Sequence, residues 1–314
     1  MSLQPILPFE PIRTEIIPEG EQWTAQIKWD GVRVLTYYDG KKVQLFNRKI
    51  NERTFHYPEL VDIKSYCTAN SVILDGEIIA LGEDGLPSFH EVMKRDGIRR
   101  MERVSQVQRS VKITYMIFDV LFYNDQWINN RMLKERMEVL SNIIIASDHA
   151  QLVTNHDHAN ALFQVMEQNG MEGIIVKDLT SPYIFGGKDN KWQKKKVFKD
   201  LYAVVGGVSF RAGIVNSLLL GLYDELGNLW YIGHAGTGKL THQDRKNITQ
   251  IVEGLKTPTL PFINIPEKEK EAIWITPMLT VKVHFLELTP NQSLRQPSIQ
   301  SLVKMDAQLC TFHQ

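Results

Sequence analysis

The chain has very little cysteine, only Cys67 and Cys310 among 314 residues, which excludes a disulfide framework and a four-cysteine zinc site. No stretch approaches the ~18 apolar residues that a membrane helix needs, and residues 1–10 lack the apolar core of a signal peptide. Basic and acidic side chains balance at 36 each, so any face for nucleic acid must be a local patch. We therefore expect a cytoplasmic protein without a membrane segment.

The length suits two domains of roughly 150 residues, and a hydrophobic content of 43% excludes wholesale disorder. Strand patterns at residues 23–28, 32–38, 72–81 and 113–123 are followed by helical patterns at 131–144 and 160–168 and by a strand pattern at 173–177. Asp39-Gly40 predicts a hairpin turn, because glycine tolerates a positive φ. Strands and helices do not alternate strictly, which predicts an α+β fold with antiparallel sheets.

Near residue 200 the pattern changes to short strands, at residues 202–210, 217–223, 229–234 and 280–288, with one helical segment at 243–255. Short strands with a single helix favour a small closed β-barrel such as an OB-fold. We therefore expect two domains, residues 1–199 and residues 200–314, although the pattern alone does not fix the type of barrel.

The most informative segment is Lys28-Trp29-Asp30-Gly31-Val32-Arg33, between two predicted strands. A lysine becomes a nucleophile when neighbouring cations or desolvation make its amine neutral. Gly31 permits a close approach of the backbone to a ligand, and Arg33 returns toward the same pocket. The segment alone is also compatible with a surface turn that carries a solvated lysine.

Five further segments follow in order: Asn47-Arg48, Leu74-Asp75-Gly76-Glu77, Phe118-Asp119-Val120-Leu121, Glu172-Gly173-Ile174-Ile175-Val176-Lys177 and Trp192-Gln193-Lys194-Lys195-Lys196. In this order the chain resembles the covalent nucleotidyltransferase superfamily, which contains ATP-dependent DNA ligases, RNA ligases and mRNA capping enzymes. The resemblance spans residues 23–199 and is closest to the minimal bacterial or phage type of ATP-dependent DNA ligase. It implies an antiparallel-sheet adenylation domain followed by an OB-fold.

The resemblance implies that Lys28 is the catalytic lysine that becomes linked to AMP. It implies that Glu77 contacts the ribose, that Glu77 and Glu172 hold the metal, and that Phe118 stacks on the purine. Carboxylates with phosphates and water suit Mg²⁺, with Mn²⁺ as an alternative. The family more often has glutamate where Gln26 stands. The residues expected to bind ATP are Gln26, Arg33, Arg48, Glu77, Phe118, Lys177, Lys194 and Lys196.

Alternation on the last strand of this domain places Lys194 and Lys196 on one face, with Lys195 pointing away. We expect Lys194 and Lys196 to contact the α-phosphate, where they stabilise charge on its oxygens, and to lower the pKa of Lys28. Lys177 is expected to join them. A solvated charged surface is the alternative for this lysine run.

Basic residues crowd one short segment of the first domain, which suits contacts with nucleic-acid phosphates without sequence reading. The segment also contains Glu91 and Glu102, and a solvated helix face is an alternative for any one of its residues. The expected DNA-binding residues are Lys94, Arg95, Arg99, Arg100 and Arg103, with Arg109 nearby.

Two segments of the second domain need separate interpretation. Residues 233–239 read G-x-x-x-x-G-K, close to a Walker A loop, but Leu240 has no hydroxyl for Mg²⁺. We interpret them as the glycine-rich strand and turn of the OB domain. Residues 302–306 lack the R-x-D-K-like ending of DNA ligases. Lys304 or Arg295 could substitute electrostatically, and Lys188 stands where related bacterial ligases often carry arginine.

The sequence therefore predicts an ATP-dependent DNA ligase that seals nicks through a lysine-AMP intermediate, acts as a monomer on nicked duplex DNA and serves repair, recombination or replication. Because Lys28 lies close to the N-terminus, we expect no preceding DNA-binding domain. Two alternatives stay open: an RNA ligase or GTP-using capping enzyme, and a non-catalytic nucleic-acid-binding protein with the same fold.

Overall fold

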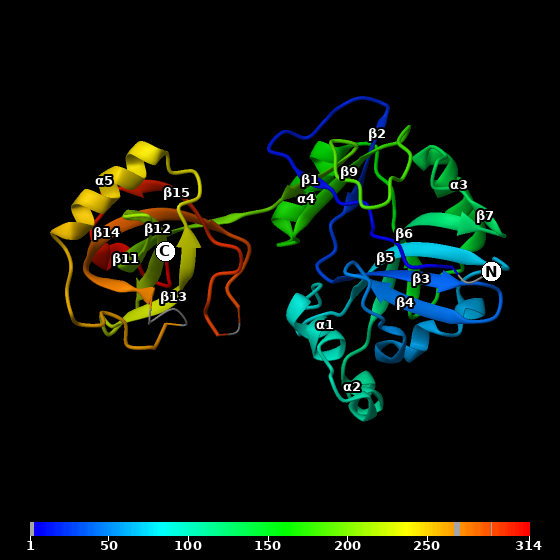
Figure 1. Ribbon diagram of the computed structural model, residues 1–314, viewed down its shortest axis with the longest axis horizontal. Coiled ribbons are helices and arrows are strands. Elements are labelled where there is room, and N and C mark those ends of the chain that lie inside the picture. Colours follow the sequence, from blue (N-terminus) through cyan, green and yellow to red (C-terminus); the bar gives the residue numbers. More distant parts are fainter. Residues whose placement is uncertain (1–2, 267–270, 290) are drawn as a thin grey trace. The chain divides into compact units, whose positions relative to one another are not determined.

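The computed structural model describes residues 3–266, 271–289 and 291–314 of the chain (Figure 1). The chain forms two compact units, Met1–Val197 and Phe198–Gln314. Each unit has its own hydrophobic core, and each is described by itself below. Within the described residues, no helix combines the length and the apolar character required to cross a membrane.

The first unit contains a four-stranded sheet with the order β1-β10-β9-β2. Strands β10 and β2 flank β9 in antiparallel pairing, while β1 runs parallel to β10. The sheet brings the segment around Lys28 next to segments that follow it by about 150 residues in the sequence. Its strands are β1 (Ile12–Arg13), β2 (Trp23–Ile27), β9 (Gly173–Asp178) and β10 (Trp192–Lys196).

The second sheet of the first unit has the order β4-β3-β5-β6-β7, with β8 pairing in parallel with β6. In the β3–β4 hairpin, the Asp39 carboxylate accepts the backbone N–H groups of Lys41 and Lys42, and Gly40 has a φ of +89°, as the predicted turn requires. The strands are β3 (Val32–Tyr38), β4 (Val43–Asn47), β5 (Val72–Ile79), β6 (Thr114–Tyr123), β7 (Gln126–Trp127) and β8 (Ala150–Leu152).

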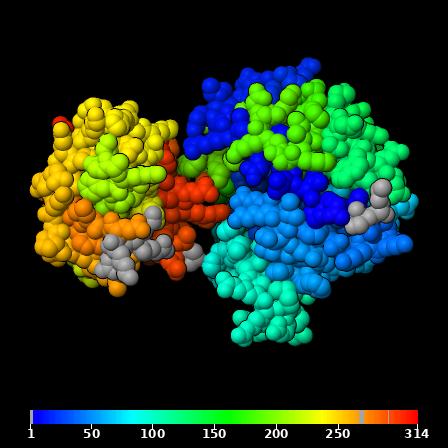
Figure 2. Space-filling view, in the orientation of Figure 1, coloured from blue at the N-terminus to red at the C-terminus, as the bar shows by residue number. Residues whose placement is uncertain are grey.

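Helices cover both sheets of the first unit and extend beyond them. Helix α3 (Leu133–Ile143) packs against β6, and α4 (Ala159–Gln168) packs against β9 and β2, close to the helical segments expected from the sequence. Helices α1 (Phe89–Asp96) and α2 (Val104–Ser110) form an arm that projects from the body of this unit (Figures 1 and 2). Short 3₁₀ turns lie at Thr54–His56, Pro58–Leu60, Ile63–Ser65 and Met101–Arg103.

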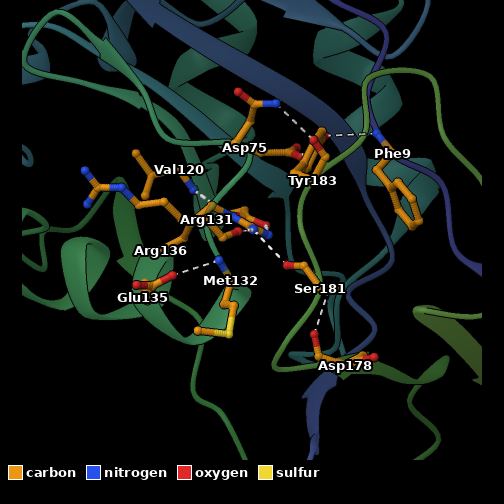
Figure 3. A network of polar contacts seen from close by, with 12 residues as sticks. Phe9, Asp75, Val120, Arg131, Met132, Glu135, Arg136, Asp178, Ser181 and Tyr183 are labelled. Atoms are coloured by element: carbon orange, nitrogen blue, oxygen red, sulfur yellow. Dashed lines mark hydrogen bonds and ion pairs between the residues drawn. The ribbon is translucent and has the colours of Figure 1, made fainter.

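A network of buried charges ties the first unit together (Figure 3). The guanidinium of Arg136 on α3 donates two hydrogen bonds to the carboxylate of Asp119 on β6, and both side chains are completely buried. Arg136 also donates to the backbone carbonyl of Ser181, which anchors the loop after β9. The paired geometry lets charged groups lie in an apolar interior, where either one alone would be costly.

The described part of the second unit is built on an antiparallel sheet with the order β13-β12-β11-β14-β15, and β13 also contacts β15 as the sheet curls. Ile248 and Val252 of helix α5 are part of its core. The elements are β11 (Lys199–Arg211), β12 (Ile214–Tyr223), β13 (Leu229–Gly236), α5 (His242–Glu253), β14 (Ile273–Phe285), β15 (Ser298–Val303) and the 3₁₀ turn Ala307–Leu309.

Two strands of the second unit differ from the sequence prediction. Strand β14 begins at Ile273 and ends at Phe285, whereas the sequence pattern predicts residues 280–288. Its pairing with β11 shifts register between Leu279 and Trp274, so Pro277 lies in an irregular stretch where no ladder hydrogen bond is required of it. The pattern does not predict strand β15, because Ser298, Gln300 and Ser301 give it little apolar alternation.

The Walker-like residues 233–239 lie in strand β13 and the turn after it, within an antiparallel sheet. A phosphate-binding loop would connect a parallel strand to a helix N-terminus. The interpretation of this segment as part of the barrel is therefore confirmed.

The burial of the Asp119–Arg136 pair allows a prediction about the free energy of unfolding. Replacing Arg136 by leucine leaves the Asp119 carboxylate buried without its partner, which should lower the free energy of unfolding by about 3–5 kcal/mol in urea titrations. Arg131→Leu is the matched control, because Arg131 begins the same region but is exposed, and it should change stability by less than about 0.5 kcal/mol. Equal stabilities of the two variants would contradict this account of the network.

Candidate nucleotide-binding site

The register of β2, β9 and β10 places the predicted site residues on one face of the first sheet. Gln26 lies opposite Ile175, which lies opposite Lys194. Two residues away along each strand, Thr24, Lys177 and Trp192 form the next row on the same face of these three strands. Side chains of cross-strand partners point to the same side of a sheet, so these six residues share one face.

Lys28 follows β2 directly, and its backbone N–H donates to the carbonyl of Gly173. Its amine forms an ion pair of 2.5 Å with Glu172, and Lys196 contacts the other oxygen of the same carboxylate at 2.8 Å. The Glu172 side chain is only 7% exposed. Gly173 has a φ of +134°, and a Cβ there would lie 2.1 Å from the carbonyl oxygen of Lys195, so only glycine brings the strands this close. One buried carboxylate thus holds two lysines together.

Lys194 adds a third cation to this cluster. Its pKa is lowered, first by desolvation and then by the positive charges of Lys196, Lys28 and Lys188, while Glu10 acts in the opposite direction. Lys188 is exposed and lies 3.7 Å from the carboxylate of Glu10. The structure therefore brings together Lys28, Lys194 and Lys196 as predicted, in a positive field suited to an anion.

Glu77 on β5 approaches the same cluster from the second sheet. Desolvation raises its pKa to about 8; Lys28 and Arg33 lower it, whereas the nearby carboxylates of Glu172 and Asp75 raise it further. The two predicted metal-binding carboxylates, Glu77 and Glu172, thus lie within electrostatic reach of each other and of the predicted nucleophile.

The donor set fits Mg²⁺ bound together with a nucleotide. The described residues contain no group of three or more histidine, cysteine, aspartate or glutamate side chains placed for a metal ion. Two carboxylates are nevertheless the number that Mg²⁺ takes from proteins when phosphates and water supply its other ligands. Glu77 and Glu172 would hold it there.

A cavity of about 360 Å³ opens beside this cluster. Gln26 and Phe118 line it together with Leu152, Val153 and Asn155, and residues of α3 complete the wall. The Gln26 amide donates to Asn155 Oδ1 at 2.7 Å, which fixes the orientation of the amide. Apolar side chains make up about half of the lining, and small-molecule sites typically combine apolar walls with a few oriented polar groups.

Arg33 lies deeper than the sequence suggested. Its guanidinium donates two hydrogen bonds to Asp75 and one to the backbone carbonyl of Phe9, and it also contacts the hydroxyl of Tyr183, which itself donates to Asp75. Figure 3 shows Asp75, Tyr183 and Phe9 within this network. The ion pair with Asp75 raises the pKa of Arg33 although burial opposes this. Arg33 is therefore a permanent cation, and its guanidinium carbon lies 5.3 Å from the ring centroid of Phe118.

Lys177 does not join Lys194 and Lys196, which corrects the sequence prediction. Its side chain is 2% exposed, and its Nζ lies 4.2 Å from the ring centroid of Phe118 and 3.9 Å from that of Trp192. The charges that act on it most strongly are those of Asp119, Asp75, Arg33 and Arg136, and no lysine is among them. Alternation along β9 predicts the face of the sheet on which Lys177 lies. It does not predict that the side chain is buried between two aromatic rings.

Arg48 lies outside the lysine cluster of the first unit. Arg48 is exposed in the turn after β4, which the side chain of Asn47 stabilises by accepting the N–H groups of Lys49 and Asn51. In the second unit, Arg295 forms an ion pair of 2.8 Å with Glu287, and Lys304 is exposed after β15.

The basic segment predicted to bind DNA lies on the projecting arm. Arg99, Arg100 and Arg103 are exposed, and Lys94 is exposed while paired with Glu91. Arg95 is a wrong prediction. It is completely buried, and its guanidinium donates to both oxygens of Glu59 and to the carbonyls of His56 and Val111, so it cannot reach a phosphate.

Several residues that shape the site were not predicted from the sequence. Asn155 lies in a loop without periodicity, and Tyr183 lies in the irregular loop between β9 and β10, so neither carried a signal. Asp75 and Trp192 belong to segments that the sequence singled out, but their roles depend on contacts with Arg33 and Lys177 from distant strands.

Comparisons with known proteins agree with this geometry. Residues 8–196 match the family model described as ATP dependent DNA ligase domain, and residues 211–305 match the model of the ATP dependent DNA ligase C terminal region. The first match covers all the residues of the site described above. The second match covers most of the unit that follows residue 197, in agreement with an OB-fold.

Relatives with curated names include the multifunctional non-homologous end joining DNA repair protein LigD of Mycobacterium tuberculosis (29% identity, 90% of this chain) and DNA ligase 2 of Methanosarcina mazei (32%, 73%). The chain spans 36% and 43% of their lengths. A solved structure of mycobacterial DNA ligase D complexed with ATP and MES is similar over 95% of both chains, with 28% identity and a TM-score of 0.54. The chain therefore belongs to the ATP-dependent DNA ligase family.

Proposed function

We propose that this chain seals nicks in duplex DNA with ATP, through a covalent AMP adduct on Lys28. The observation that carries the proposal is the cluster in which Glu172 holds the Lys28 and Lys196 amines while Lys194 lies nearby. The cluster places a lysine amine beside two further cations that can neutralise the charge of a phosphate that it attacks.

In the first step the Lys28 amine attacks the α-phosphorus of ATP. A nitrogen–phosphorus bond forms, the bond between the α-phosphorus and its bridging oxygen breaks, and pyrophosphate leaves. Glu172 is the group within hydrogen-bond reach of the amine that can accept its proton. Lys194 and Lys196 stabilise the negative charge on the α-phosphate oxygens.

The cavity beside the cluster suits the nucleoside part of ATP. Phe118 offers an aromatic face for the base, and the Gln26 amide supplies a polar contact at its edge. The charges of Lys28 and Arg33 both act on the Glu77 carboxyl. We expect Glu77 to contact the ribose from this position. A bound Mg²⁺ would neutralise phosphate charge at Glu77 and Glu172.

In the following steps AMP passes from Lys28 to the 5′-phosphate at a nick, and the 3′-hydroxyl then displaces AMP and joins the strands. LigD of M. tuberculosis bears the name of an end-joining repair protein, so repair of broken DNA is the pathway that we favour. The exposed arginines of the projecting arm are the candidates for holding the DNA backbone. Arg48, exposed on its turn, is a candidate for a phosphate contact.

An RNA ligase or a GTP-using capping enzyme would form the same kind of lysine adduct, so the substrates must distinguish them. We expect adduct formation with ATP rather than GTP, and sealing of nicked DNA in preference to nicked RNA. The resemblance to named DNA ligases over both units favours DNA.

Replacing Lys28 by arginine should abolish both the AMP adduct and nick sealing, because a guanidinium keeps the charge but does not act as a nucleophile at neutral pH. The adduct is read from the intact mass after incubation with ATP and Mg²⁺, and sealing from a labelled nicked duplex. Lys195→Arg is the control, since Lys195 lies on the other face of β10, where it contacts the Glu15 carbonyl. Retention of sealing by the Lys28 variant would contradict the proposed mechanism.

Replacing Arg99, Arg100 and Arg103 together by serine should weaken binding to a nicked duplex. The slope of log affinity against log salt should become shallower by about 0.9 for each DNA phosphate that the variant no longer neutralises. The measurement is fluorescence anisotropy with a labelled nicked duplex at several salt concentrations.

Two controls accompany this triple variant. Serine at Lys41 and Lys42, in the exposed β3–β4 turn, removes charge elsewhere on the same unit. The AMP adduct on Lys28 should form normally in both variants. An unchanged salt slope in the arginine variant would exclude the arm as a DNA-binding surface.

A further inference from the structure

Lys177 is a buried lysine that has no role in the proposed reaction. It contributes no hydrogen bond to the described part of the chain, since its Nζ is buried and has no hydrogen-bond partner there. Leaving a buried amine unpaired costs free energy. Such a cost at the edge of a binding site points to a role in binding rather than in folding.

The acidic groups near Lys177 are already occupied. Both carboxylate oxygens of Asp75 accept hydrogen bonds from Arg33, and one also accepts the hydroxyl of Tyr183. Both oxygens of Asp119 accept hydrogen bonds from Arg136. In this part of the described structure, three cations with little or no exposure therefore lie near two buried carboxylates, and Lys177 is the one without a carboxylate partner.

The amine instead lies against two aromatic rings. Its Nζ is 4.2 Å from the centroid of Phe118 and 3.9 Å from that of Trp192, well within the range of a cation–π contact. The two rings meet edge to face, with centroids 6.1 Å apart. Phe118 lines the 360 Å³ cavity, whereas Lys177 does not, so of these two side chains only the ring borders the cavity.

We propose that Lys177 is a positioning residue for the nucleotide base, which it affects through Phe118. The ammonium holds the ring in place and draws its π electrons inward, which makes the cavity face of the ring electron-poor. An electron-poor ring stacks well on an electron-rich purine. This inference rests on the proposed function only in that the cavity binds the base of ATP.

The test measures equilibrium binding of α,β-methylene-ATP, an analogue that cannot transfer AMP, by isothermal titration calorimetry at about pH 6, where Lys177 with its pKa of about 7 carries its charge. Lys177→Met keeps the length and apolar body of the side chain but removes its charge, and we expect the Kd to rise roughly 3- to 30-fold. Lys177→Arg should restore much of the affinity. Lys195→Met is the matched control, because Lys195 lies over the Phe163 ring on the opposite face of the sheet, and its Kd should not change.

A double-mutant cycle shows whether Lys177 acts through the ring. In a Phe118→Leu background, Lys177→Met should cause little further loss of affinity. An equal loss in both backgrounds would mean that Lys177 contacts the nucleotide itself, and an unchanged Kd in the single variant would mean that it has no role in binding; either result overturns the inference. Absence of analogue binding by the wild-type protein would overturn the proposed function as well.

Stability provides a second readout that a purely structural lysine would not give. Burial lowers the pKa of Lys177 from 10.5 to about 7, with Asp119 and Asp75 opposing the shift and Arg33 and Arg136 adding to it. Between these two pH values the unfolded chain binds more protons than the folded one, so stability rises with pH across this interval. The cost of burying the amine is therefore complete below pH 7 and disappears as the pH rises toward 10.5.

Lys177→Met should accordingly raise the melting temperature at about pH 6, and its advantage over the wild type should shrink by about pH 9. The combination of higher stability and weaker analogue binding is the signature of a residue kept for binding. A Lys177→Met variant that melts earlier than the wild type in the acidic buffer, with an unchanged Kd, would show that the lysine stabilises the fold instead.

Discussion

The ion pairs of Glu172 with Lys28 and Lys196 are the interaction on which the rest of the site depends. Three lysines that converge on a partly buried face repel one another, and a carboxylate that is 7% exposed offsets part of this repulsion. The geometry requires β9 to run between β2 and β10, with Gly173 allowing the close approach of the backbone. The fold of the first unit thus assembles cations that a triphosphate can neutralise.

Two arginine–aspartate ion pairs lie near the lysine cluster. The Arg33–Asp75 and Arg136–Asp119 pairs have little or no exposure to solvent. They connect strands of the second sheet with α3 and with the loop that carries Ser181 and Tyr183 (Figure 3). Pairs of this kind contribute little net stability compared with apolar packing, but they fix geometry once formed. The Arg33 guanidinium carbon lies 5.3 Å from the centroid of the Phe118 ring, and the occupied carboxylates leave Lys177 beside the same ring without a carboxylate of its own.

Much of this site could be predicted from the sequence, because alternation along β10 and the order of six short segments do not depend on distant contacts. The faces of Lys194 and Lys196 follow from the period of a strand. The burial of Arg95 could not be predicted, since it depends on Glu59 from another segment. The depth of Lys177 likewise depends on Trp192 across the sheet, and strand β14 was misplaced because Pro277 interrupts its pattern.

The central claim is that one amine among these cations carries the nucleotide. Proteolytic digestion after incubation with ATP and Mg²⁺, followed by tandem mass spectrometry, locates the modification directly. The account predicts a phosphoramidate-linked AMP on Lys28 and on no other lysine. AMP on Lys194 or Lys196, or an unmodified Lys28 peptide, would contradict it.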